Sequence, residues 1–228
     1  MIIQNNILKY ILKNTYFING TAYAGKSTMV KLLAEKYNGI LCKENYHDEL
    51  MGAIDAINQP NLSYFQTMSG WQEYINRSPE EYDAWIIGTS KEAAELEIIK
   101  LIQLSLQNKK IFVDTNIPIE LLKEIADYHH VAFMLAPQIM SVEKFFDRED
   151  PEKQFLYRKI QESANPAKTL VNFKACLAKL NSQEHYDEFV QSGYFTYIRT
   201  EQSTIAQALS VIEQHFGLSQ GDGGVGTI

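Results

Sequence analysis

The residues with the clearest chemistry form a short run near the amino end of the chain. Residues 20–27 read Gly-Thr-Ala-Tyr-Ala-Gly-Lys-Ser and fit the pattern G-x-x-x-x-G-K-[ST] without a mismatch. The two glycines let the backbone curl, so that successive N–H groups point inward at phosphate oxygens. The lysine would reach the β- and γ-phosphates, and the serine hydroxyl would bind Mg²⁺. The run therefore predicts a nucleotide-phosphate site made by Gly20, Thr21, Ala22, Tyr23, Ala24, Gly25, Lys26, Ser27 and Thr28.

The segments that flank this run suit a phosphate site. An apolar strand is predicted over residues 16–19, and a helix over about 26–37, where Met29, Leu33 and Tyr37 recur at helical spacing. A helix that begins at the loop adds the positive end of its dipole to the site. A glycine turn that only caps a helix is the alternative, and this context disfavours it.

A carboxylate ends the third predicted strand, residues 110–114. Asp114 stands at the tip of that strand, where it could hold Mg²⁺ directly or through water. The alternative is a helix N-cap, but Thr115 and Asn116 compete better for that position. We therefore predict that Ser27 and Asp114 form the metal site.

An acidic stretch, residues 43–49, follows the second predicted strand at 39–42. Ligands gather at the carboxyl ends of the strands in an open parallel sheet, so a carboxylate here would face the γ-phosphate. Glu44 is the first candidate for a general base that accepts a proton from a substrate hydroxyl, and Asp48 is the second. A solvated acidic loop is the alternative.

Arginines follow the fourth predicted strand, residues 131–136. Arg148, on a segment that could close over the site, is the candidate to neutralise charge on the transferred phosphoryl group, with Arg158 second. An ordinary solvated helix is the alternative.

Two further segments carry weaker signals. Trp71, Tyr74, Arg77 and Trp85 could stack a planar substrate, although an aromatic helix face packed on the core is the favoured interpretation. A loop that begins at Arg199 would lie beside the adenine of a bound nucleotide.

These residues need a scaffold of alternating strands and helices. The predicted strands are residues 16–19, 39–42, 110–114, 131–136 and 194–200, and helices are predicted over about 91–107, 118–128, 141–163, 168–180 and 203–216. Leu96, Ile99, Ile102 and Leu106 fall on one side of the helix at 91–107. Such alternation predicts an α/β fold with a parallel sheet covered on both faces.

One domain is expected over residues 1–218, with a mostly helical substrate-binding insertion at 43–108, a lid at 141–165 and a disordered tail at 219–228.

The composition argues against several classes of partner and metal site. The 228 residues carry 28 acidic and 21 basic side chains, a net charge of -7 that argues against a general nucleic-acid partner. Two cysteines cannot form a disulfide framework or a cysteine-rich zinc site. No membrane or secretory segment is predicted, so we expect a cytoplasmic protein without a membrane partner. The oligomeric state stays open, with a homodimer as one alternative.

Taken in order, these features resemble the P-loop small-molecule kinases, such as nucleoside and nucleotide kinases, shikimate kinase and chloramphenicol phosphotransferases. The resemblance covers about residues 15 to 217, and only the phosphate loop (Walker A) is specific. It implies a three-layer α/β/α sandwich with a five-stranded sheet in the order 2-3-1-4-5, and ATP with Mg²⁺ as cofactors. In that resemblance Glu44 matches the general base and Arg148 matches the lid arginine.

The third strand departs from this pattern, because Asp-Thr-Asn stands where deoxynucleoside kinases have Asp-Arg. No single substrate family is matched. The resulting expectation is an ATP-dependent transferase that phosphorylates a small-molecule hydroxyl or phosphate. The alternative is a nucleotide-binding regulatory switch without such an acceptor.

Overall fold

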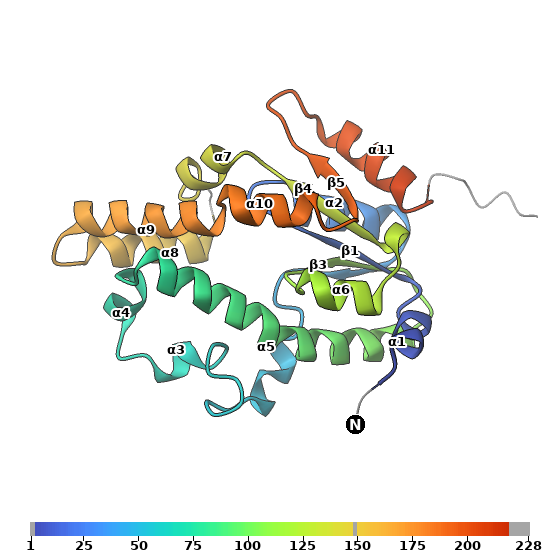
Figure 1. Ribbon diagram of the computed structural model, residues 1–228, viewed down its shortest axis with the longest axis horizontal. Helices are drawn as coiled ribbons and strands as arrows, with labels where there is room; N and C mark the ends of the chain where they lie inside the picture. Colours follow the sequence, from blue (N-terminus) through green and yellow to red (C-terminus); the bar gives the residue numbers. More distant parts are fainter. Residues whose placement is uncertain (1–2, 148–149, 219–228) are drawn as a thin grey trace, which may run out of the picture.

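Five parallel strands form one sheet at the centre of the molecule (Figure 1). The computed structural model describes residues 3–147 and 150–218. The strand order is β2-β3-β1-β4-β5, which confirms the predicted fold class and order. The strands are β1 (Thr15–Gly20), β2 (Ile40–Cys42), β3 (Ile111–Asp114), β4 (Val131–Leu135) and β5 (Phe195–Ile198).

Helices surround the sheet and extend beyond one end of it. They are α1 (Asn5–Ile11), α2 (Lys26–Lys36), α3 (Tyr64–Thr67), α4 (Trp71–Ile75), α5 (Pro79–Ser105), α6 (Ile119–Ile125), α7 (Gln138–Glu143), α8 (Pro151–Gln161), α9 (Pro166–Leu180), α10 (Gln183–Val190) and α11 (Ile205–His215). Two 3-10 helices are η1 (Asp48–Ala53) and η2 (Tyr128–His130).

Successive residues of each inner strand face opposite sides of the sheet, as the strand repeat requires. Phe17 and Val113 point into a first core, which consists of Leu8, Leu12, Phe17, Cys42, Ala94, Leu101, Ile111, Val113, Ile117, Leu122, Ile125, Ala126, Val131 and Phe133. Helices α1, α5 and α6 contribute to that core. The sheet is therefore buried on this face by helices that lie far apart in the sequence.

The other face of the sheet carries a second core under α2 and α11. It consists of Tyr16, Ile18, Ala24, Met29, Val30, Leu33, Ala34, Phe112, Ala132, Met134, Ala136, Ala208, Ile212 and Phe216. Two covered faces explain why the strands read as continuous apolar runs.

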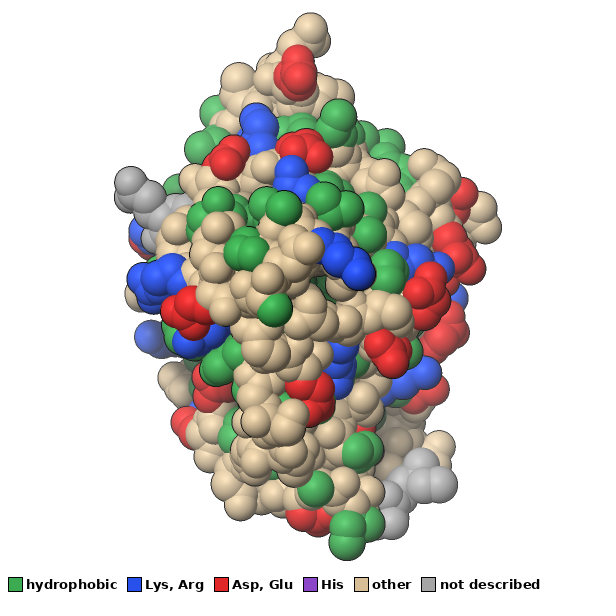
Figure 2. Space-filling view, turned by 90° about the vertical axis from the view of Figure 1, so that its left-hand side faces the viewer, with side chains coloured by type: hydrophobic (Ala, Val, Ile, Leu, Met, Phe, Trp, Pro, Cys, Tyr) green, Lys and Arg blue, Asp and Glu red, His purple; other side chains and the backbone are tan. Residues whose placement is uncertain are grey.

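A third core lies outside the sheet, among helices α3, α4, α5, α8 and α9 (Figure 1, left). It consists of Tyr64, Tyr74, Ile75, Tyr82, Ile160, Phe173, Cys176 and Leu177. Helix α5 belongs to both the first and the third core, because it is 27 residues long. Figure 2 looks onto this helical end of the molecule, where basic and acidic side chains are interspersed.

Helix α5 differs from its prediction. It begins at Pro79, twelve residues before the predicted start at 91, because Pro79 occupies the first turn and Ser78 with Glu81 forms a capping box. The predicted apolar side is partly wrong, since Ile99 is 47% and Leu106 82% exposed.

The structure refines two other predicted segments and adds one helix that was not predicted. Helices make up most of residues 43–108, as predicted, but η1 is the one described helix between residues 43 and 63. The segment predicted as helix at 141–163, where Pro151 offers a break, is two helices, α7 and α8, and Asp150 caps the second. Helix α10, which the sequence did not predict, is capped by Ser182. Residues 219–228, the predicted tail, lie outside the described residues.

Within the described ranges, no helix combines the length and the apolar composition needed to span a membrane.

Candidate functional site

The predicted phosphate loop connects β1 to α2 in a conformation that requires its two glycines. Gly20 has φ +125° and Gly25 has φ +99°, both in the range that side chains rarely adopt. A Cβ on Gly20 would overlap the carbonyl oxygen of Met134 in β4. The loop can therefore follow the edge of the sheet closely only with glycine at this position.

The amino end of α2 differs from that of every other described helix of eight or more residues. The N-cap side chains of α5, α8, α9, α10 and α11 each accept a hydrogen bond from a backbone N–H of the first turn. The N-cap residue of α2 is Gly25, which has no side chain to do so. The first N–H groups of an α-helix have no partner within the helix. In this helix they are available to an anion, and the helix dipole favours a negative charge there.

Lys26 and Ser27 lie at the opening of the loop. The Lys26 ammonium donates to the carbonyl oxygens of Gly20 (3.1 Å) and Thr21 (3.2 Å), so it stays within the loop. The Ser27 hydroxyl donates to Asp114 Oδ2 at 2.5 Å. The structure thus brings the predicted cation and both predicted metal ligands together at the ends of β1 and β3.

Asp114 is a buried carboxylate, 3% exposed. Burial raises the pKa of Asp114, while the charge of Lys26 and the hydrogen bond from Ser27 act in the opposite direction.

The donor set around Asp114 fits Mg²⁺ rather than a metal held only by protein. No group of three or more His, Cys, Asp or Glu residues that could hold a metal occurs in the described part of the chain. One carboxylate and one hydroxyl suit Mg²⁺, which takes its other ligands from water and nucleotide phosphates.

Neighbouring elements hold the phosphate loop in place. Thr21 donates its backbone N–H to Met134, and its hydroxyl accepts from the Ala136 backbone N–H at 2.7 Å. Ser141 of α7 donates to the Ala22 carbonyl at 2.8 Å, and the Tyr23 hydroxyl donates to the Lys144 carbonyl. Tyr23 itself has φ +66°, an uncommon value for a tyrosine.

In the described part of the chain, Arg199 contacts the loop. It follows β5 and donates to the Tyr23 carbonyl at 2.6 Å. It also lines a pocket of about 110 Å³, whose other walls include Gly25, Thr28, Tyr197 and Thr204. The loop at Arg199 thus lies beside the phosphate loop.

The two candidate bases lie in different surroundings. Glu44 is exposed and accepts a hydrogen bond from Asn116 (3.3 Å), two residues beyond Asp114. The charge of Glu44 contributes to the raised pKa of Asp114. Asp48 is also exposed, at the start of η1, and its charge acts on His47. The geometry therefore favours Glu44 over Asp48 as the carboxylate of this edge of the sheet.

No protein-family model matches the chain, and no curated protein matches it.

A functional candidate that the sequence did not reveal is Glu97 of α5. Glu97 is 5% exposed and accepts hydrogen bonds from Tyr46 and Thr115. Burial is the main reason why its pKa rises to about 7, and the charges of Glu44 and Asp114 add to the effect. One feature of the sequence could have indicated that Glu97 is buried. It lies on the same face of α5 as Ala93, Ala94 and Leu101.

Of the two predicted arginines, Arg158 alone belongs to the residues that the structure describes. Arg148 lies outside the described residues. Arg158 is exposed in the last turn of α8, a helix that packs mainly against α4 and α9.

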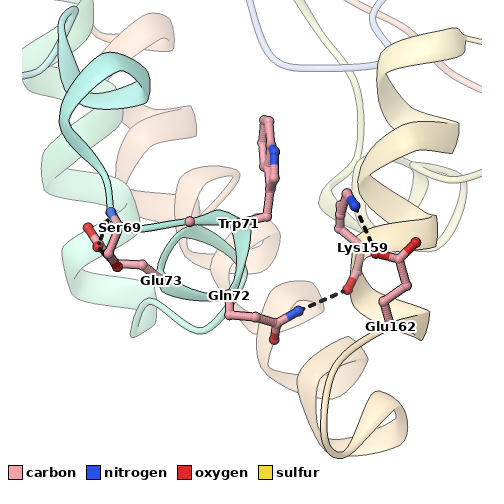
Figure 3. A pocket seen from close by; sticks show the side chains of 7 residues that line it. Ser69, Trp71, Gln72, Glu73, Lys159 and Glu162 are labelled. Carbon is pink, nitrogen blue, oxygen red and sulfur yellow. Dashed lines mark hydrogen bonds and ion pairs between the residues drawn. The ribbon is translucent and has the colours of Figure 1, made fainter.

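The aromatic segment is mainly structural, which confirms the favoured interpretation. Tyr74 belongs to the third core, and the Arg77 guanidinium stacks on Tyr64 (3.8 Å) and on Trp85 (5.3 Å). Trp71 packs against this core and also lines an open groove of about 370 Å³ between α4 and α8 (Figure 3). In that groove Gln72 donates to the Lys159 carbonyl, and Lys159 pairs with Glu162.

Proposed function

We propose that this chain is a kinase that transfers the γ-phosphoryl group of ATP to a hydroxyl or phosphate of a small molecule. The observation that carries the proposal is the meeting of Lys26, Ser27, Asp114 and Glu44 at the carboxyl ends of the adjacent strands β1, β3 and β2. The phosphate loop would hold ATP through the free N–H groups at the start of α2. The resemblance to P-loop small-molecule kinases supports the same reaction.

Each residue then has one task in the transfer. Glu44 would accept the proton of the attacking hydroxyl, because it is the exposed carboxylate beside Asp114. Lys26 would stabilise the charge on the equatorial oxygens of the transferred group. Arg199 would orient the loop through Tyr23. Most of the rate enhancement would come from positioning and electrostatics.

Ser27 and Asp114 would hold Mg²⁺, since their oxygens already lie 2.5 Å apart. When bound, Mg²⁺ would neutralise negative charge on the nucleotide phosphates.

The first experiment measures phosphoryl transfer from [γ-³²P]ATP with Mg²⁺ to nucleosides, nucleoside monophosphates, shikimate, sugars and hydroxylated antibiotics. Lys26→Ala is the matched variant, and we expect it to lower kcat/KM by at least about 10²-fold. Labelling of one acceptor by the wild type but not by the variant supports the kinase proposal.

A different outcome would favour the switch alternative. If the protein binds ATP, labels no acceptor and hydrolyses ATP faster when a partner protein is added, then the kinase proposal fails.

A further inference from the structure

Glu97 is an unusual residue to bury in the first layer of helices beside the sheet. It is 5% exposed, and a carboxylate in such a place is costly unless hydrogen bonds or an opposite charge compensate it. In the described part of the chain, the one side chain within 4.0 Å that can carry a positive charge is His47, whose Nδ1 lies 3.6 Å from Glu97 Oε1. Burial lowers the pKa of His47, which disfavours that charge. His47 is itself 5% exposed, and its Nδ1 has no hydrogen-bond partner.

Three separate elements meet at this carboxylate. Tyr46, in the loop after β2, donates its hydroxyl to Glu97 Oε2 at 2.9 Å. Thr115, directly after β3, donates its hydroxyl to the same oxygen at 2.7 Å. The Thr115 hydroxyl also accepts from the Ile117 backbone N–H at 3.0 Å, which fixes its orientation. Glu97 thereby ties the loop after β2 and the end of β3 to α5.

The two hydrogen-bond donors are close in sequence to the two carboxylates of the candidate site. Tyr46 is two residues from Glu44, and Thr115 is next to Asp114. An apolar side chain of similar volume would fill this space without a buried charge, and such replacements are often neutral or stabilising. A satisfied polar network instead specifies one arrangement of the groups that it joins.

We propose that Glu97 is a positioning residue that fixes Glu44 relative to Asp114 by holding Tyr46 and Thr115. The catalytic part of this inference rests on the proposed kinase function. The structural part, that Glu97 orders the loop after β2, does not depend on it.

The structural part is tested by hydrogen exchange in the ligand-free protein. The reporters are the backbone amides of Tyr46, Asp48 and Leu50, which donate within the loop at 2.8–3.2 Å. We expect Glu97→Met and Thr115→Val to speed their exchange at least tenfold, and Thr115→Ser, which keeps the hydroxyl, to stay within twofold of the wild type. If Glu97→Met does not fold, the two Thr115 variants decide the outcome.

Glu213→Met is the matched control. Glu213 is also buried (6% exposed) and also accepts from a tyrosine, Tyr37 at 3.0 Å, but it lies on α11 under the opposite face of the sheet. We expect it to leave the three amides unchanged. Equal exchange rates in wild type, Glu97→Met and Thr115→Val would overturn the inference.

The catalytic part is tested with the acceptor that the panel identifies. We expect Thr115→Val to lower kcat at least tenfold with the KM for ATP within about twofold, and Thr115→Ser to restore kcat. If Thr115→Ser lowers kcat as much as Thr115→Val does, then the hydroxyl is not what matters at this position. That result would overturn the catalytic part of the inference. If the wild type transfers no phosphoryl group at all, the kinase proposal fails, while the exchange experiment still decides whether Glu97 orders the loop.

Discussion

At the scale of single residues, the choice between the two candidate bases follows from their neighbours. Both Glu44 and Asp48 are exposed, but only Glu44 is linked to the end of β3, through Asn116 at 3.3 Å. We predict that Glu44→Gln lowers kcat by about 10²–10⁴-fold and that Asp48→Asn lowers it by less than about tenfold. Steady-state kinetics with the identified acceptor measures both, and the reverse order would assign the base to Asp48.

Glu97 also makes the stability of the protein depend on pH. Its pKa is about 7 in the fold against 4.5 for an unperturbed glutamate. Above pH 4.5 the unfolded chain loses the proton, while the folded chain keeps it until about pH 7. Rising pH therefore destabilises the wild type between about pH 4.5 and 7. Below pH 4.5, Glu97 is protonated in both states and does not make the stability depend on pH.

Glu97→Gln removes the titrating carboxyl group but keeps an oxygen of similar position. The variant should therefore gain stability relative to the wild type as the pH rises from about 4.5 to 7. The gain is on the order of 3 kcal/mol, from a shift of about 2.5 pH units at ~1.36 kcal/mol each. Urea unfolding at several pH values measures it. A stability difference that does not change with pH would mean that Glu97 is ionised in both states.

The sequence predicted these residues unevenly, for a physical reason. Lys26, Ser27 and Asp114 stand at fixed places relative to a strand end, so their meeting could be foreseen. Glu97 could not, because its partners Tyr46 and Thr115 are 51 and 18 residues away along the chain. Only the packing of α5 on the sheet brings them together.

At the scale of elements, the strand-to-helix turn after β1 depends on Gly20. An alanine there would combine φ +125° with an overlap on the Met134 carbonyl. We predict that Gly20→Ala costs more than about 2 kcal/mol and abolishes ADP binding, because the loop must move away from β4.

Gly193→Ala is the control. Gly193 also has a positive φ, +87°, but a Cβ there would have no atom within 4 Å. It should cost only about 1 kcal/mol and leave ADP binding intact. Thermal unfolding and calorimetric titration with ADP compare the two variants. Equal effects would mean that the steric overlap at Gly20 has no importance.

Arg199 connects β5 to the phosphate loop, and its loss should weaken nucleotide binding. We predict that Arg199→Ala raises the Kd for ADP about tenfold, because the Tyr23 carbonyl loses a hydrogen bond from a charged donor. Lys174→Ala removes the same charge from an exposed pair with Glu143 and should leave the Kd unchanged. Equal changes in both variants would point to net charge instead.

Helix boundaries were predictable where apolar periodicity was strong and failed where capping decided. The predicted start at residue 91 missed Pro79, although proline suits the first turn of a helix and begins α5. Helix α10 has a polar sequence, and Phe189 is its one side chain that packs on the first core. Its cap at Ser182 was the better signal.

At the scale of the whole molecule, α5 joins the first and third cores and should make them unfold together. Both tryptophans of the chain, Trp71 and Trp85, pack against the third core, so their fluorescence reports on that part alone. Circular dichroism reports on all the helices and strands. We predict that the two signals change at the same urea concentration.

Phe173→Ala sharpens this test, because Phe173 is fully buried in the third core. It should lower the free energy of unfolding by about 3–5 kcal/mol and shift both signals equally. A shift confined to fluorescence would mean that the helical end unfolds by itself, and would contradict a single domain over residues 1–218.

The two thiols provide a built-in chemical record of such openings. Cys42 lies in the first core and Cys176 in the third, and burial raises their pKa values to about 12 and about 11. Native molecules should therefore resist alkylation at neutral pH, because the reactive thiolate is scarce and shielded. When a molecule opens, the identity of the alkylated cysteine identifies the core that admitted the reagent. An alkylated fraction recovered from cells would then show which end of the protein fails first in its natural setting.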